Sequence, residues 1–184
     1  MLKRLSMLAL FCAGMYLLDA CCGDNKPFFD YQKLTVYSAI VPFQNTADSV
    51  LALRVEPAEV EYLASAYKLT IGTPAYGTSC PDPGEEGTKY KMTAVDIYAD
   101  KNFNDTLPAG TSLSSIFFNG RSSNTSKPIA QGVSELEFLL PQWDFLIYTP
   151  LEPTQPNQTF TLTVKITKSD GSVAEGKVTG VKFK

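Results

Sequence analysis

Residues 159–183, TFTLTVKITKSDGSVAEGKVTGVKF, carry the clearest structural pattern in the chain. Every second residue from 160 to 166 is apolar and the residues between them are threonine or lysine, which is the period of a β-strand with one buried face. Ser169-Asp170-Gly171 predicts a hairpin turn, because glycine tolerates the positive φ of tight turns. Gly176 and Gly180 indicate a bulge in the return strand. The stretch therefore predicts an antiparallel β-hairpin.

Shorter runs of the same alternation occur along the rest of the chain. They predict strands at 33–41, 50–56, from about 67, 92–100, 134–140 and 143–148. One helical turn is expected within 111–118, where Thr111 and Ser112 are good N-caps. Strands with turn signals between them, and no helix of ordinary length, predict an all-β fold. We expect a single immunoglobulin-like antiparallel β-sandwich, with an open barrel as the alternative.

The stretch 72–88, GTPAYGTSCPDPGEEGT, interrupts this pattern with four glycines and three prolines. A loop of this length in a compact domain is usually functional, and a disordered surface insertion is the alternative. Tyr76 and Tyr90 flank Cys80 and are expected to be exposed. They are the predicted contact residues of a binding loop, whereas most other aromatic residues are expected in the core.

The N-terminus, MLKRLSMLALFCAGMYLLDACC, has the layout of a secretory signal. Lys3 and Arg4 precede an apolar run from Leu5 to Leu18, which is shorter than the roughly 20 residues that a spanning helix needs. The expected organisation is a signal peptide over 1–20, a short tether over 21–31 and a β-sandwich domain over 32–184.

Leu18-Asp19-Ala20-Cys21 resembles a bacterial lipobox. The resemblance implies cleavage after Ala20 and acylation of Cys21 through its sulfur and its new amine, with the polypeptide held on a membrane by several acyl chains. A plain secretory signal, with both cysteines serving the fold, is the alternative.

Two cysteines are then left for the domain. Cys12 leaves with the signal and Cys21 carries lipid, so Cys22 and Cys80 are candidates for one disulfide in an oxidising compartment. Closing a loop of about 58 residues would stabilise the fold by roughly 4 kcal/mol in the chain-entropy model. Two unpaired thiols are the alternative.

The composition argues against several classes of function. Without residues 1–20, which contain two basic residues and one acidic residue, the chain has 14 basic and 18 acidic residues and a net charge of −4. It has no basic cluster for nucleic acid. The chain contains no histidine, which removes imidazole-based nucleophile arrangements and imidazole zinc sites. We therefore expect neither an enzyme nor a cofactor or metal site.

Three acidic or amide-rich segments are candidates for metal binding or acid–base chemistry. Asp100-Lys101-Asn102-Phe103-Asn104-Asp105 places oxygen side chains at positions 1, 3 and 5, as calcium loops do, but lacks the glycine and the bidentate glutamate of an EF-hand. A turn capped by these side chains is the preferred interpretation. Glu85-Glu86 and the pair Glu135 and Glu137 lack an apolar surround and are expected to face solvent.

Residues 101–117, KNFNDTLPAGTSLSSIF, together with Ser79-Cys80-Pro81 and the double cysteine, resemble a group of uncharacterised Bacteroidetes lipoproteins of about 200 residues. The resemblance implies a lipoprotein of the cell envelope, at the outer membrane, with a β-rich domain and no known activity. In that setting Asp48-Ser49-Val50 and Asp105-Thr106-Leu107 are similar to the O-glycosylation acceptor of this phylum. Solvated turns are the alternative for both.

The expected function is a lipid-anchored envelope module that binds a glycan or another envelope protein. The alternative is a structural or assembly accessory of a surface fibre or nutrient-uptake complex, in which an edge strand pairs with a partner. A hydrolase that uses carboxylates is the third hypothesis.

Overall fold

The computed structural model describes residues 26–42, 49–64, 82–120, 127–155 and 158–183, and these residues confirm an all-β fold. They form seven strands and two short 3-10 helices. The elements are β1 (Phe28–Pro42), β2 (Ser49–Leu63), β3 (Met92–Ala99), β4 (Phe118–Asn119), η1 (Ile129–Gln131), η2 (Val133–Glu135), β5 (Phe145–Thr149), β6 (Thr159–Lys168) and β7 (Val173–Lys182).

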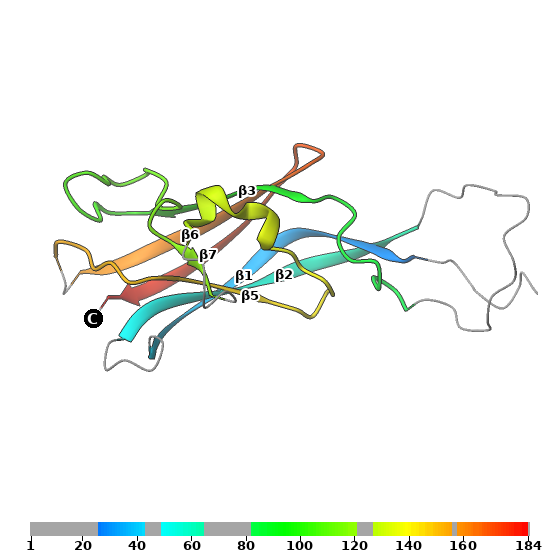
Figure 1. The fold of residues 1–184 in the computed structure, drawn as a ribbon, viewed down its shortest axis with the longest axis horizontal. Helices are drawn as coiled ribbons and strands as arrows, with labels where there is room; N and C mark the ends of the chain where they lie inside the picture. Colours follow the sequence, from blue (N-terminus) through cyan, green and yellow to red (C-terminus); the bar gives the residue numbers. More distant parts are fainter. Residues whose placement is uncertain (1–25, 43–48, 65–81, 121–126, 156–157, 184) are drawn as a thin grey trace, which may run out of the picture.

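The strands form one curled sheet in the order β3-β6-β7-β1-β2-β5-β4, which resembles half of a barrel (Figure 1). Neighbouring strands are antiparallel except β1 and β7, which are parallel. The expected immunoglobulin-like sandwich is not confirmed, because it requires two packed antiparallel sheets. The two long hairpins, β1–β2 and β6–β7, are neighbours in the sheet, and their adjacent strands β1 and β7 run parallel.

The β6–β7 hairpin follows the sequence prediction closely. Gly171 has φ +85° in the turn, and the carboxylate of Asp170 accepts hydrogen bonds from the amide and hydroxyl of Ser172, which lower the pKa of Asp170. The register shifts near Gly180, which has φ +75°, so the predicted bulge lies there. Gly176 is not at the bulge. It allows β7 to approach β1 closely, because an added Cβ would lie 2.4 Å from the carbonyl oxygen of Leu34 on β1.

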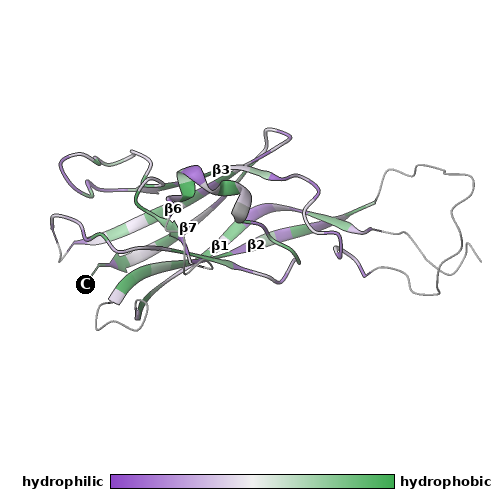
Figure 2. Ribbon diagram, in the orientation of Figure 1, coloured by the Kyte–Doolittle hydropathy of each residue, from purple (hydrophilic) through white to green (hydrophobic). Residues whose placement is uncertain are grey.

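Irregular segments between residues 100 and 144 cover the core face of the sheet. Phe103, Leu113, Phe117, Ile129 and Phe138 from these segments join the strand residues in one apolar cluster. Figure 2, coloured by hydropathy, shows hydrophobic residues along the strands and within this cover. The second layer of the domain is therefore made of turns and 3-10 helices.

The buried face of β1 changes along its length. Phe29 and Tyr31 are buried at its start, whereas Leu34 and Val36 are buried further on. The change lies at Gln32 and Glu59, the one position missing from the otherwise continuous β1–β2 register, and Glu59 has φ +51°. A residue in this left-handed conformation rotates the backbone, so the two ends of the ribbon turn different faces toward the core.

Several sequence expectations differ from the structure. Residues 134–140 contain η2 and extended chain in place of a strand, although burial still alternates there. Residues 114–116 form a hydrogen-bonded turn rather than a helix, and the expected tether over 21–31 overlaps β1, which begins at Phe28. The strand expected from about residue 67 lies outside the described residues.

Candidate functional site

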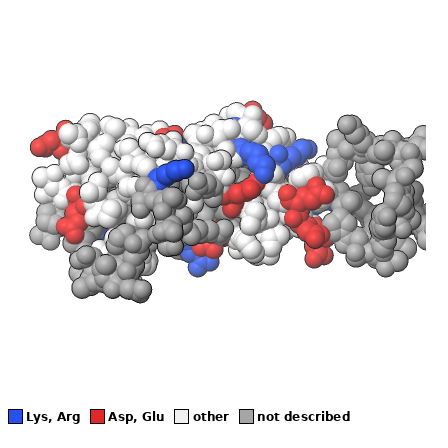
Figure 3. Space-filling view, in the orientation of Figure 1, with Lys and Arg blue, Asp and Glu red and all other residues white. Residues whose placement is uncertain are grey.

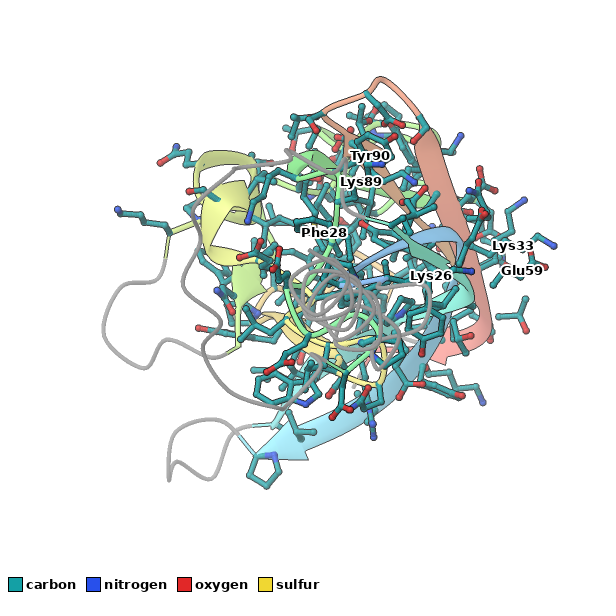
Figure 4. The ribbon with its side chains drawn as sticks, turned by 90° about the vertical axis from the view of Figure 1, so that its right-hand side faces the viewer. Lys26, Phe28, Lys33, Glu59, Lys89 and Tyr90 are labelled. Atoms are coloured by element: carbon teal, nitrogen blue, oxygen red, sulfur yellow. The ribbon has the colours of Figure 1, made fainter. Side chains whose placement is uncertain are left out.

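The start of β1 is bound to the segment that follows the glycine- and proline-rich stretch. Four backbone hydrogen bonds of 2.8–3.0 Å join the two segments, and Phe29 and Thr88 form a parallel bridge. The bonds run from Gly84 N to Lys26 O, from Glu86 N to Pro27 O, from Phe29 N to Gly87 O and from Lys89 N to Phe29 O. Figure 4 looks onto this end of the molecule, with Lys26, Phe28, Lys89 and Tyr90 labelled. Residues 26–29 are therefore an integral part of the domain.

Four of the predicted site residues, Cys21, Cys22, Tyr76 and Cys80, lie outside the described residues. In the sequence, Cys22 is four residues before Lys26 and Cys80 is four residues before Gly84, and Gly84 N donates to Lys26 O at 3.0 Å.

Tyr90 is the predicted binding-loop residue that the structure does describe. It was expected to be exposed, but it is half-buried, and the ammonium of Lys89 lies 5.9 Å from the centre of its ring. Its ring is therefore less accessible to a ligand than the sequence indicated.

A buried ion pair lies behind this end of the sheet. Lys168 Nζ donates to Asp30 Oδ1 at 2.6 Å and to the carbonyl of Tyr31 at 2.9 Å, and the two side chains are 1% and 10% exposed. The Lys168 ammonium also lies 5.0 Å from the centre of the Tyr31 ring. Burial, with a smaller contribution from Asp30, raises the pKa of Tyr31. The pair joins the end of β6 to the start of β1.

Of the two residues of this pair, only Lys168 carries a signal in the sequence. Lys168 continues the even-numbered alternation of 160–166, and its position on the buried face predicts a charge that needs a partner. Asp30 gave no comparable signal, because it lies beside the irregularity at which β1 changes its buried face.

The calcium-like segment 100–105 is a set of capped turns. Asn104 Oδ1 accepts hydrogen bonds from both the amide and the hydroxyl of Thr106, Asn102 Oδ1 accepts from the amide of Ala109, and Asp100 Oδ1 accepts from the amide of Thr161. This confirms the preferred interpretation. A polar hollow of about 210 Å³ lies beside the segment. Within the described ranges, no three Cys, Asp or Glu side chains gather closely enough to hold a metal ion.

The possible glycosylation acceptors are placed only in part. Thr106 is exposed and its hydroxyl donates to Asn104, which agrees with a solvated turn. In the other motif, Ser49 begins β2, Val50 is buried, and Asp48 lies outside the described residues.

Two of the four carboxylates in the candidate acid and base pairs have other partners, and the side chain of Glu135 lies outside the described residues. Glu85 is exposed and accepts from the amide of Asp82, and Glu137 forms an ion pair with Lys91. A second hollow, of about 370 Å³ on the outer face of the sheet, contains Glu175. Ion pairs with Lys177 and Lys165 lower the pKa of Glu175, so it is a poor proton donor.

Basic and acidic residues are interspersed on the face shown in Figure 3, without an extended basic patch. Among the described residues, no helix has the length and apolarity to cross a membrane. No family model, curated protein or solved structure matches the chain.

Proposed function

We propose that this protein is a lipoprotein of the bacterial cell envelope, at the outer membrane, anchored through acylated Cys21, and that its domain binds another envelope component. The observation that supports the proposal most is the attachment of Lys26 and Phe29 to segment 84–89. Only residues 21–25 would then separate the lipid from the sheet, a span of at most about 18 Å. The domain would stand directly on the membrane without a long stalk.

A binding role accounts for the described polar groups better than catalysis does. Asp30, Glu137 and Glu175 each neutralise a lysine, and the oxygens of Asn102 and Asn104 cap turns. These groups hold the structure together and leave the loops and strand edges as contact surfaces. In the same proposal, the curled sheet and its irregular cover correspond to the two layers of a sandwich-like domain.

A disulfide between Cys22 and Cys80 belongs to this proposal. Both cysteines lie four residues before the hydrogen-bonded positions 26 and 84, and the bridge of Phe29 with Thr88 shows that the two segments run in the same direction. The bond would add a covalent link beside the lipid.

The anchor is tested by growing cells with an alkyne analogue of palmitate and measuring the label on the purified protein. We expect label on the wild type and on Cys22→Ser, and none on Cys21→Ser. Equal labelling of wild type and Cys21→Ser would overturn the anchor. Non-reducing peptide mapping of the mature protein should find the Cys22–Cys80 peptide, and two alkylated thiols at these positions would exclude the disulfide.

A further inference from the structure

Among the described residues, the second half of β1 has a strand neighbour on one side only. Residues 35–42 pair with β2 along their whole length, whereas the pairing of β1 with β7 consists of Lys33 with Glu175. Beyond that contact the far ends of β1 (blue) and β7 (red) lie apart in Figures 1 and 4. No other described segment forms a bridge with residues 35–42. We call residues 35–42 the open edge.

The outer edges of the sheet are protected in a way that the open edge is not. Along β3, the carbonyl oxygens of Val95, Ile97 and Ala99 accept hydrogen bonds of 2.7–3.1 Å from the segment 110–114. At the opposite edge, β5 is covered by β4 and by a hydrogen bond from Gly120 N to Leu146 O. Proteins commonly cover edges in this way because unpaired backbone groups recruit other strands.

The open edge has the composition of a strand that pairs. Its sequence, TVYSAIVP, contains no charged residue and is rich in β-branched and apolar residues. Four consecutive residues, 37–40, are exposed, and Tyr37 and Ile40 are 52% and 44% exposed. Their partners on β2 are residues 51–54, of which 51–53 are buried and Arg54, opposite Tyr37, is exposed. At positions 38–40 the exposure is therefore on the β1 side of the hairpin.

The register indicates which backbone groups of the open edge face away from β2. Leu34 lies opposite Pro57, which has no N–H, so this pair occupies a position of the ladder without hydrogen bonds. Such positions alternate along an antiparallel pair. The backbone groups of Val36, Ser38 and Ile40 therefore point toward β7 and are available to another strand.

We propose that the open edge binds an extended, uncharged segment of another envelope protein as an added strand between β1 and β7. The added strand would take main-chain hydrogen bonds from the open edge, and Tyr37 and Ile40 would contact its side chains. An uncharged segment fits because residues 35–42 carry no charged side chain that could pair with a desolvated charge of the partner, and Lys177 on the β7 side is already paired with Glu175. The proposal rests on the proposed function, of which it specifies the partner chemistry.

The segments 65–81 and 21–25 are too short to reach Ser38, in the middle of the open edge. The described residues on either side of 65–81, Leu63 and Gly84, pair with Phe28 and Lys26 at the start of β1. Ser38 lies ten residues further along β1, about 33 Å away, and a return path of about 66 Å exceeds the roughly 60 Å that 17 residues span. After cleavage, residues 21–25 do not reach Ser38 either.

A second copy of the chain does not fit the edge either. Antiparallel pairing of two open edges around a two-fold axis would direct the two N-termini in opposite directions. Two chains anchored in one membrane through Cys21 are incompatible with that arrangement.

The test places p-benzoylphenylalanine at Ala39 in the full-length chain and irradiates intact cells. Ala39 is exposed on the open edge, and Thr163 on the outer face of β6 is the control position. We expect a covalent adduct from position 39 that exceeds the adduct from position 163, and mass spectrometry should locate it in an uncharged partner segment of about five residues or more.

A second substitution shows whether the adduct depends on strand pairing. Ser38→Pro removes an outward N–H without removing a bond of the β1–β2 ladder, and Ser38→Ala is its control. We expect Ser38→Pro to reduce the adduct about tenfold or more at an unchanged unfolding midpoint, because a pairing donor is lost and the ring obstructs the added strand. If Ser38→Pro does not fold, Ser38→Lys tests the same point with a charge on the edge.

Three outcomes would overturn the proposal. They are the absence of an adduct above the control, an adduct that Ser38→Pro and Ser38→Lys both leave unchanged, and an adduct with a second copy of this chain. Failure of the lipid anchor is distinguishable, because it appears as loss of palmitate label with the adduct intact.

Discussion

Lys168→Met is the most informative single substitution for the stability of this domain. Methionine keeps most of the length and apolar stem of lysine but leaves the Asp30 carboxylate without its ion pair, and it removes a donor from the carbonyl of Tyr31. Removing one partner of a buried pair costs about 3–5 kcal/mol, because the remaining charge stays desolvated. We expect a loss of this size in the free energy of unfolding.

Urea unfolding followed by the fluorescence of the single tryptophan measures the effect. Lys33→Met is the matched control, because Lys33 and Glu59 form an exposed pair with side chains 64% and 55% accessible. An exposed pair of this kind contributes about 0–1 kcal/mol. The Asp30→Asn substitution should recover about 2 kcal/mol or more in the Lys168→Met protein, since a buried neutral amide costs less than an unpaired carboxylate.

Two results would refute this reasoning. One is a cost of Lys168→Met no greater than that of Lys33→Met. The other is a double variant whose destabilisation equals the sum of the two single losses, because independent sites add and coupled charges do not.

Three further substitutions test other parts of the fold by the same unfolding assay. Gly176→Ala should lower the free energy of unfolding by about 1–3 kcal/mol, because its Cβ would lie 2.4 Å from the Leu34 carbonyl oxygen. Gly132→Ala is the control: its nearest neighbour would be 3.8 Å away, so the loss should be less than about 1 kcal/mol, and equal losses would contradict the close approach at Gly176. Tyr31→Phe should stabilise the fold by about 1 kcal/mol, because the buried hydroxyl has no hydrogen-bond partner among the described residues. Because burial raises the pKa of Tyr31, the unfolded chain loses this proton at a lower pH than the folded protein does, so the free energy of unfolding falls as the pH rises above about 10; Tyr31→Phe should flatten that fall, and an unchanged pH profile would exclude the role. Asn104→Ala should cost about 1 kcal/mol by removing a turn cap, and a neutral result would show that the backbone holds the turn unaided.

A predicted strand was confirmed where residues close together in the chain are enough to specify it, and was wrong where a strand also needs a distant partner. The alternation in 159–168 specified a strand, its buried face and its hairpin, because all three depend on residues close together in the chain. The alternation in 134–140 specified burial correctly, with Leu136 and Phe138 inside, but no strand of the described part of the chain pairs with this segment. Alternation describes an extended chain over a core, and only a hydrogen-bonded neighbour makes that chain a strand.

The features of the candidate site also separate into those that the sequence predicts and those that only the fold shows. The signal-like N-terminus and the composition without histidine are properties of the sequence alone and predict location and class of function. Three other features appear only in the fold. The hydrogen bonds between residues 26–29 and 84–89 and the buried pair of Lys168 with Asp30 join residues more than fifty positions apart. The open edge of β1 depends on which strands lie beside it.

The sequence by itself determined an all-β chain, its principal hairpin and the position of a potential lipid anchor, because these follow from side-chain period and local motifs. Only the tertiary structure decided that the strands form one curled sheet, that β1 and β7 meet in parallel at a single pair, and that the edge beyond them stays open. The physical reason is that strand order and closure depend on contacts between distant segments, which the period of a strand does not encode.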